Sequence, residues 1–595
     1  MLSLINKGIR YWHTLRYLKP VQFYGRLWFK FVQPRLDVAH ADFSIRANVG
    51  EWNKPIAHAA TMLGPSQFKF LGIEHSLAST GGWNDESLQK LWLYNLHYFE
   101  DLNAQEADNR INWHLALLQR WVHENPPPLG NGWEPYPTSL RIVNWVKWSL
   151  AGNELPATCI QSLGLQARWL SKRLEIHLLG NHLFANGKAL VFAGLYFEGA
   201  EANNWLNKGL QIIARELPEQ VLQDGGNFER SPMYHAIFLE DVLDLLNIAN
   251  THVEAIPSTT QEQWGAVAVK MLKWLQGMSH PDGKISLFND AAFEIAATYQ
   301  DLALYAERVL PEHLLGFSTV DSALQALPLS LTQFLDSGYL RLQSPNAVAL
   351  LDVAPIGPDY LPGHAHADTL SFELSLFGQR VIVNGGTSQY GLGPERLRER
   401  QTASHSTVEI DGQSSSEVWG GFRVARRAYP FDLEIAETDN KVLVSCAHNG
   451  YRRLKGKPVH RRKWQFSESR LVIEDCVEGQ FDTAFAYFHL HPSVTVKVFE
   501  TGSWYLLLTG GQRAIFSVQA GDAQLVSSHY APEFGKTLQT QCFKVTLGKV
   551  ALSEVTLSKI ALSEARLGKR RLVEAGSGKV DWGDVGSRVC IDWNL

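Results

Sequence analysis

The chain has 595 residues, of which 45% are hydrophobic and 19% charged, and a net charge of −5. This length predicts two or three domains, each large enough to bury a core, and the acidic balance argues against nucleic acid as a partner. The five scattered cysteines have no C-x-x-C spacing, which argues against a disulfide framework or a zinc ribbon.

Residues 1–85 are interpreted as a basic, aromatic arm and lead-in. Its first acidic residue is Asp37, and before it stand seven basic residues: Lys7, Arg10, Arg16, Lys19, Arg26, Lys30 and Arg35. The segment lacks the apolar core and cleavage site of a signal peptide, and no run in the chain reaches the roughly 18 apolar residues of a membrane span. We therefore expect a soluble protein, in the cell envelope or the cytoplasm. The arm either makes peripheral contact with an anionic membrane or packs against the main domain, and the second interpretation is favoured.

Residues 86–330 show helical periodicity, with apolar side chains three and four positions apart. Proline and glycine separate these segments, for example at 125–132. The pattern predicts nine or ten helices and an all-α domain, arranged as a ring of helical hairpins. The predicted helices cover 92–102, 111–121, 140–150, 160–174, 184–197, 202–222, 233–248, 263–278 and 291–310.

Residues 331–595 change to short alternating runs bounded by turn residues, which predict a sandwich of antiparallel sheets. The predicted strands are 338–343, 347–353, 380–383, 407–410, 441–445, 470–474 and 484–489. At about 545–572 leucine recurs every five residues, from Leu547 to Leu572. A period of five fits neither helix nor strand, so we interpret this repeat as an expanded loop or hairpin without a catalytic part.

Several polar clusters could carry chemistry. In Gly363-His364-Ala365-His366-Ala367-Asp368, two histidines stand at the start of an alternating run, where they would project to one face of a strand. Such a pair can bind a metal, catalyse or simply lie at the surface. Asn181 precedes a helical run and could be its N-cap, and Tyr234 at the start of another could serve packing alone.

Together these motifs resemble the heparinase II/III family of polysaccharide lyases and the related oligoalginate lyases. The resemblance runs from about Trp92 to Gly420. It rests on Tyr94-Asn-Leu-His-Tyr-Phe99, Gly132-Trp-Glu-Pro-Tyr-Pro137, 363–368 and Ser404-His-Ser-Thr-Val-Glu-Ile-Asp-Gly412. It implies an N-terminal (α/α) toroid followed by an antiparallel β-sandwich, in agreement with the periodicity.

The resemblance also implies cleavage of a uronic-acid-containing glycan by β-elimination, with a bacterial capsule, exopolysaccharide or glycosaminoglycan-like chain as substrate. Asn181 and His182 match the residues that neutralise the uronate carboxylate, and Tyr234 matches the catalytic tyrosine. His364 is the partner for proton transfer, and Tyr390 aligns with a tyrosine of the alginate-lyase branch.

In relatives a structural zinc ion ties strands beneath the site, and its ligand positions correspond here to His366, Asn384 and His405. Asn384 replaces an aspartate, so a neutral oxygen stands where a carboxylate would add charge, and we expect weaker affinity. No organic cofactor is implied.

Substrate contacts are expected from the helical domain, at Glu134, Tyr136, Arg141 and Asn144, and from a basic patch at Arg396, Arg398 and Arg400. Two other functions stay open. A glycoside hydrolase would need two carboxylates, for which Glu134 and Glu229 are the candidates, and a non-catalytic protein could bind or assemble cell-surface polysaccharide on the same fold. The expected partner is an acidic polysaccharide or oligosaccharide, and the oligomeric state stays open.

Overall fold

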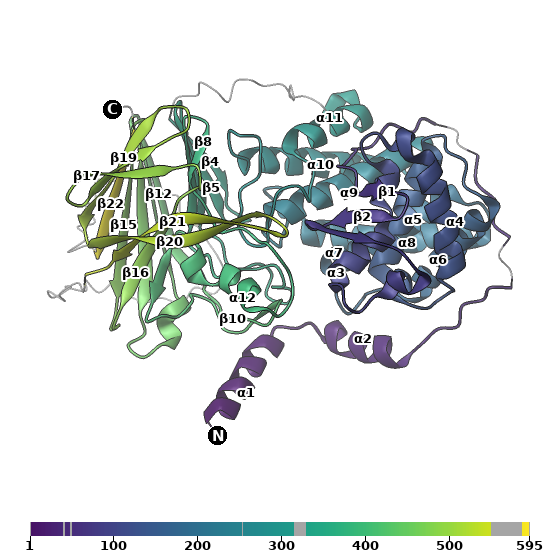
Figure 1. The fold of residues 1–595 in the computed structure, drawn as a ribbon, viewed down its shortest axis with the longest axis horizontal. Coiled ribbons are helices and arrows are strands. Elements are labelled where there is room, and N and C mark those ends of the chain that lie inside the picture. The colour runs from purple at the N-terminus through teal and green to yellow at the C-terminus, as the bar shows by residue number, and fades with distance from the viewer. Residues whose placement is uncertain are drawn as a thin grey trace.

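The computed structural model describes residues 2–39, 42–47, 50–252, 254–314, 329–548 and 586–593. Helices build one half of the molecule and antiparallel sheets the other, while two N-terminal helices lie along the outside (Figure 1). This confirms the predicted fold class. The five-residue repeat lies almost entirely outside the described residues, so its predicted conformation is not tested.

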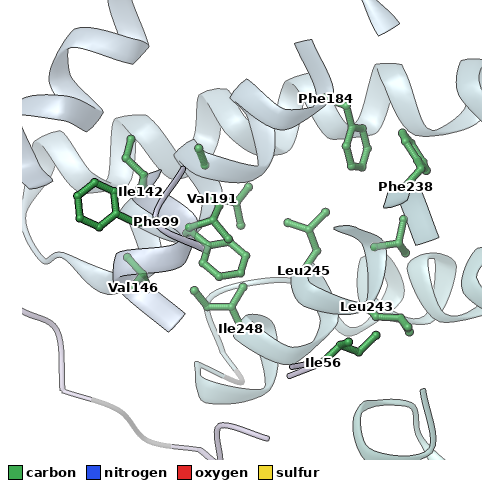
Figure 2. Close-up of a cluster of buried hydrophobic side chains, with 14 of the residues drawn as sticks. Ile56, Phe99, Ile142, Val146, Phe184, Val191, Phe238, Leu243, Leu245 and Ile248 are labelled. Carbon is green, nitrogen blue, oxygen red and sulfur yellow. The ribbon is translucent and has the colours of Figure 1, made fainter. Parts of the chain in front are cut away.

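The helical half packs around a continuous apolar core. Ten of its side chains are labelled in Figure 2, among them Phe99, Phe184 and Ile248. α7 is apolar on nearly all sides and is buried along almost its whole length, as expected for a helix surrounded by others. The helices are α3 (Lys90–Tyr98), α4 (Ile111–Glu124), α5 (Pro135–Leu150), α6 (Ala157–Lys172), α7 (Gly180–Tyr196), α8 (Ala200–Gln220), α9 (Pro232–Thr251), α10 (Ser258–Gly277) and α11 (Tyr299–Val309).

Two features of this half differ from the sequence interpretation. The helix predicted from residue 291 begins only at Tyr299, because Thr298 and Asp301 cap it reciprocally through side chain and backbone. The lead-in also contains a small antiparallel sheet that the pattern did not predict: β1 (Met62–Gly64), β2 (Gln67–Phe70) and β3 (Ile73–Ser76). Phe70 packs edge-on against Trp92 and so fixes this sheet to α3.

The other half consists mainly of three antiparallel sheets. The first, in spatial order, contains β4 (Ser330–Phe334), β5 (Tyr339–Ser344), β6 (Ala347–Asp352), β7 (Phe372–Leu376) and β8 (Gln379–Ile382). The second is β12 (Pro430–Thr438), β13 (Lys441–His448), β14 (Val459–Phe466), β15 (Arg470–Glu478), β22 (Ser587–Asp592), β19 (Arg513–Ala520), β18 (Ser503–Leu507) and β17 (Thr495–Glu500). The third is β20 (Asp522–Glu533), β21 (Lys536–Thr546), β16 (Ala484–His489) and β9 (Val408–Ile410).

The segment between α10 and α11 belongs to the helical half and contacts the sheet half. Its backbone reaches the sheet half at Phe293, whose N–H donates to the Pro532 carbonyl at 2.7 Å. In the same segment, His280 Nε2 lies 2.7 Å from Oε2 of the buried Glu373 on β7. These contacts place the segment 279–298 where residues of both halves can meet.

Candidate active site

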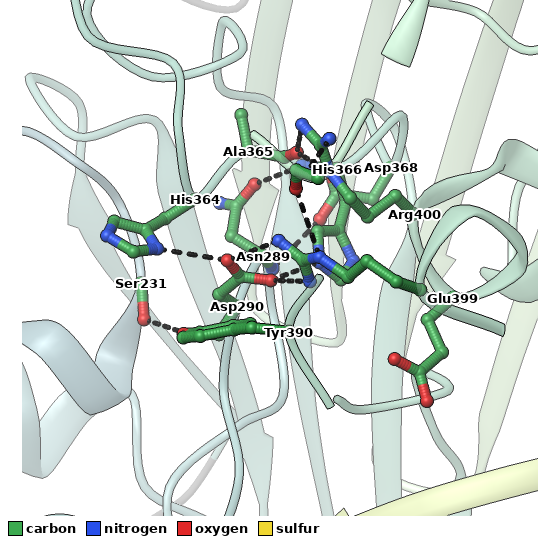
Figure 3. A network of polar contacts seen from close by, with 12 residues as sticks. Ser231, Asn289, Asp290, His364, Ala365, His366, Asp368, Tyr390, Glu399 and Arg400 are labelled. Carbon is green, nitrogen blue, oxygen red and sulfur yellow. Dashed lines mark hydrogen bonds and ion pairs between the residues drawn. The ribbon is translucent and has the colours of Figure 1, made fainter. Parts of the chain in front are cut away.

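His364 and His366 lie in a loop before β7, so the prediction that they share one face of a strand is wrong. The loop turns at Pro362, whose carbonyl accepts from the Ala365 N–H at 3.3 Å. Both imidazoles nevertheless reach one carboxylate, that of Asp290 (Figure 3). His364 Nδ1 lies 2.9 Å from Asp290 Oδ2, and His366 Nε2 lies 2.8 Å from Oδ1.

Asp290 is the fully buried centre of this cluster. Arg396, from α12 (Pro394–Arg400), pairs with both carboxylate oxygens, through NH2 at 2.7 Å and through NH1. Burial alone would raise the pKa of Asp290, but the Arg396 charge and the two histidines outweigh it and hold this pKa well below its ordinary value. Asp290 is therefore ionised at neutral pH.

The Asp290 carboxylate sets the tautomer of His364. Because it accepts the Nδ1–H, the neutral imidazole keeps its lone pair on Nε2. Nε2 lies 3.6 Å from Glu229 Oε2, and the ring lies over that of Tyr234 with centroids 3.8 Å apart. Burial raises the pKa of Glu229, against the opposing effect of His364 and His182. His364 thus offers a proton-accepting nitrogen beside a buried acid and a phenol.

Tyr234 stands at the N-terminus of α9, where Ser231 is the N-cap and accepts the Tyr234 N–H at 3.2 Å. Its hydroxyl lies 3.0 Å from that of Tyr390, so the two tyrosines come together from different halves. Burial raises the pKa of both phenols well above the ordinary tyrosine value. Both are therefore protonated at neutral pH.

Asn181 and His182 occupy the first turn of α7. The N-cap is Leu179, with φ of 64°, so Asn181 is not the helix cap. A Cβ added at Gly180 would lie 3.5 Å from Glu229 Oε1, which places the start of α7 against the carboxyl that contacts His364. The start of α7 and His364 therefore both lie against Glu229.

His182 carries positive character into this group. Its Nδ1 lies 3.2 Å from Glu175 Oε1, and its ring lies 4.4 Å from that of Tyr136, centroid to centroid. Burial opposes protonation, but the negative charge of Glu175 dominates and raises the pKa of His182. Tyr136 thus lies beside His182, and its contact with substrate stays a prediction.

The other predicted substrate contacts are engaged elsewhere. Glu134 accepts from Lys90 Nζ at 2.9 Å and from the Tyr94 hydroxyl. Arg141 is fully buried, with its guanidinium 3.8 Å from the Trp121 ring centroid. Asn144 donates to the Tyr98 carbonyl at 2.9 Å. Arg141 and Asn144 therefore hold helices together, and their placement does not support substrate contact.

The predicted basic patch is also corrected. Arg396 and Arg400 are buried, the first on Asp290 and the second on the Ala365 carbonyl, to which its NH2 donates at 2.8 Å. Arg398 pairs with Glu395 on its own helix at 2.6 Å. Two of these arginines hold the histidine loop instead of facing solvent.

The three predicted metal ligands lie close together, but they differ in which of their polar atoms are hydrogen-bonded. The ring centroids of His366 and His405 are 5.2 Å apart, and Asn384 Oδ1 lies 3.2 Å from His405 Nδ1. Two buried ring nitrogens, His366 Nδ1 and His405 Nε2, have no hydrogen-bond partner. Among the described residues no group of three or more His, Cys, Asp or Glu side chains is placed to hold a metal ion. The two ring nitrogens without partners are the candidate donors, while the Asn384 side-chain oxygen is bonded to His405.

Asp290 had no role in the sequence interpretation, and Glu229 was considered only for hydrolysis. The available signal was the pair Asn289-Asp290 after a buried strand-like run. Asn289 adopts φ of 57°, its side chain donates to the Arg230 carbonyl at 3.0 Å, and it accepts the His366 N–H at 3.0 Å. This turn is what delivers Asp290 to both histidines.

Comparison with known proteins follows the same division into two halves. Residues 104–312 match the family model "Heparinase II/III N-terminus", and residues 326–567 match "Heparinase II/III-like, C-terminal". A heparin-sulfate lyase of Bacteroides stercoris is 28% identical over 257 residues, 40% of this chain and 38% of that protein. One of Pedobacter heparinus is 28% identical over 323 residues, 49% of this chain and 47% of that protein. The chain thus matches less than half the length of these two relatives.

Solved structures share the fold over a longer span. A crystal structure of heparinase III superposes with a TM-score of 0.62 at 16% identity, covering 96% of this chain and 88% of the other. A mutant of the heparan sulfate lyase HepC from Pedobacter heparinus gives 0.58 at 18% identity, covering 96% and 87%.

Proposed function

The chain belongs to the heparinase II/III family, and from this premise we propose that it is a polysaccharide lyase that cleaves a uronic-acid-containing glycan by β-elimination. The observation that carries the proposal is the meeting of Tyr234 and His364, with ring centroids 3.8 Å apart. Elimination needs a base and an acid on one sugar, and these two groups come from different halves of the molecule.

The protonation states suggest how the two roles divide. The lone pair of His364 on Nε2 accepts the C5 proton, while Asp290 stabilises the imidazolium that forms. Tyr234, whose pKa is raised by burial, keeps its proton and donates it to the departing glycosidic oxygen. Electrons of the broken C5–H bond form the new C4–C5 double bond, and those of the C4–O bond leave with the oxygen. No water is consumed.

The C5 proton becomes acidic only when the neighbouring carboxylate is neutralised. His182, with its raised pKa, supplies positive charge, and Asn181 supplies an amide donor from the same helical turn. Both stabilise the charge that builds on the carboxylate as the C5 proton leaves.

Hydrolysis would need two carboxylates with opposed protonation states across the scissile bond. Of the proposed pair, Glu134 is bound to Lys90 and Tyr94, while Glu229 lies against His364. The contacts of Glu134 are therefore a poor fit to a hydrolytic base, and elimination is the better supported chemistry.

The test is to incubate the purified protein with a panel of acidic polysaccharides and record ultraviolet absorbance. Elimination leaves an unsaturated sugar that absorbs, whereas hydrolysis leaves none. We expect Tyr234→Phe to lose roughly 10²–10⁴-fold in turnover and to keep its affinity for the glycan. Tyr390→Phe, which removes the neighbouring hydroxyl, is the matched control and should lose less. Reducing ends released without absorbance would contradict elimination.

A structural zinc ion held by His366 and His405 is proposed as well. Its support is the two buried ring nitrogens without partners, each on an imidazole whose other nitrogen is bonded, to Asp290 in one case and to Asn384 in the other. That arrangement fixes both lone pairs on the unbonded nitrogens. The ion would tie the histidine loop to the segment before β9.

A further inference from the structure

Residues 2–36 form an arm that contacts both halves of the molecule. This N-terminal arm, residues 2–36, contains α1 (Leu2–Leu15) and α2 (Pro20–Phe31). On α1, Tyr11 packs edge-on against Trp419 of the sheet half, with ring centroids 4.9 Å apart. On α2, Phe29 packs on His177 of the helical half at 4.4 Å. Figure 1 shows the two helices end to end along one edge of the molecule.

The outward side of α2 carries the apolar stripe that a surface helix normally turns toward the core. Tyr24, Leu27, Trp28 and Phe31 follow the three–four spacing of one helix face, and Tyr24, Leu27 and Phe31 are 59%, 60% and 73% exposed. The side packed against the body instead presents Gln22 and Gly25, both buried.

α1 repeats this arrangement with fewer residues. Trp12 is 65% exposed, and Ile9 and Leu15 beside it are also exposed. The two helices together expose many large apolar side chains. Single exposed hydrophobic residues are normal on a protein surface, whereas a group of them indicates a binding surface.

The same surface is strongly basic. Lys19 is paired with Glu219 of the body, and no acidic residue precedes Asp37. The exposed bases of the arm are Lys7, Arg10, Arg16, Arg26, Lys30 and Arg35.

We propose that the outer face of the N-terminal arm binds the surface of an anionic lipid bilayer. Large apolar side chains flanked by Lys and Arg on helices parallel to a surface are what interfacial binding requires. A second copy fits less well, because a symmetric contact would bring two sets of positive charges together. An acidic glycan could stack on the rings of this face, but the aliphatic Leu27, Ile9 and Leu15 offer it neither a flat ring nor a hydrogen bond, whereas lipid accepts both kinds of side chain.

The proposal is tested by co-sedimentation of the full chain with vesicles of phosphatidylcholine, with and without phosphatidylglycerol. We expect binding to the anionic vesicles alone, and weaker binding as salt rises. We expect vesicle affinity to fall at least about tenfold in two variants of the arm. One is the triple variant Leu27→Ser, Trp28→Ser, Phe31→Ser, and the other is the double variant Arg26→Gln, Lys30→Gln. A matched control, Val498→Ser with Phe499→Ser on β17, removes exposed apolar side chains from a distant strand and should bind as the wild type does.

We expect circular dichroism of each arm variant to match that of the wild type, because the replaced side chains are exposed. Three results would overturn the proposal: no binding to anionic vesicles, full binding by both arm variants, or equal losses in the β17 control. Two further measurements separate other occupants. A wild-type dimer in sedimentation velocity that the triple variant abolishes would assign the face to a second copy, and retention on heparin that the triple variant loses would assign it to a glycan.

Discussion

At the scale of single residues, Asp290 shows how one buried charge can organise a site. It orients His364, bonds His366 and neutralises Arg396, and all three partners come from other parts of the chain. The pair Asn289-Asp290 indicates a turn in the sequence, but nothing there distinguishes this aspartate from an ordinary turn residue. His364 and Tyr234 could be predicted because they stand in recognisable motifs, but a residue defined by three distant partners could not.

Asp290→Asn should destabilise the fold by about 3–5 kcal/mol, because Arg396 then stays buried without a counter-charge. The folded pKa of Asp290 is depressed, so its ionic contribution is fully present above the unfolded value of about 3.9 and is lost as pH falls through the folded pKa. The difference between wild type and variant in urea unfolding should therefore be constant from pH 7 to about 5.

Asp439→Asn, at an exposed turn, is the control and should change stability by less than about 0.5 kcal/mol. An equally small effect at Asp290 would show that its ion pair contributes nothing to the fold.

At the scale of elements, the first turn of α7 contains Asn181 and His182 but does not use Asn181 as its cap. The helix begins at Gly180, and Leu179 is its N-cap. The sequence had suggested a cap at Asn181, because asparagine before an apolar run is the usual signal. The actual boundary lies two residues earlier, where backbone at positive φ starts the helix.

Asn181→Ala should therefore leave stability within about 0.5 kcal/mol and lower kcat by roughly 10–10³-fold, as expected for one lost donor to a developing charge. Asn181→Asp should lower it further, because a second negative charge would face the uronate. Steady-state kinetics and thermal unfolding measure the two effects separately. An alanine variant with wild-type kcat would remove Asn181 from the mechanism.

The connection between β8 and β9 contains Asn384 and His405 and carries the metal proposal. We expect the purified protein to contain about one zinc ion per chain by elemental analysis, and His405→Ala to lower zinc content and melting temperature together. His489→Ala is a matched control, because His489 is also a buried histidine nearby but both its ring nitrogens are bonded, to Ser528 and Ala403. Wild-type protein free of zinc would end the proposal.

At the scale of the whole molecule, periodicity predicted the two halves but not how they join. α8, α9 and α10 follow the predicted ranges closely, because apolar spacing of three and four persists over five turns. Arg141 sits on such a helix too, yet the pattern does not tell whether a polar residue faces a ligand or a neighbouring helix. The segment 279–298, for which no helix or strand was predicted before residue 291, holds Asp290 and contacts between the halves.

Among the described helices none is long and apolar enough to pass through a bilayer.

The order of strands in the eight-stranded sheet has a consequence for how the protein is made. β22 lies between β15 and β19, pairing Val472 with Cys590 on one side and Phe516 with Ile591 on the other. During synthesis both neighbours leave the ribosome well before residues 587–592, and until those residues arrive each neighbour has an unpaired edge in the middle of the future sheet. Translation must therefore pass residue 592 before this sheet can close, and a nascent chain paused earlier exposes two adhesive edges that chaperones would have to shield.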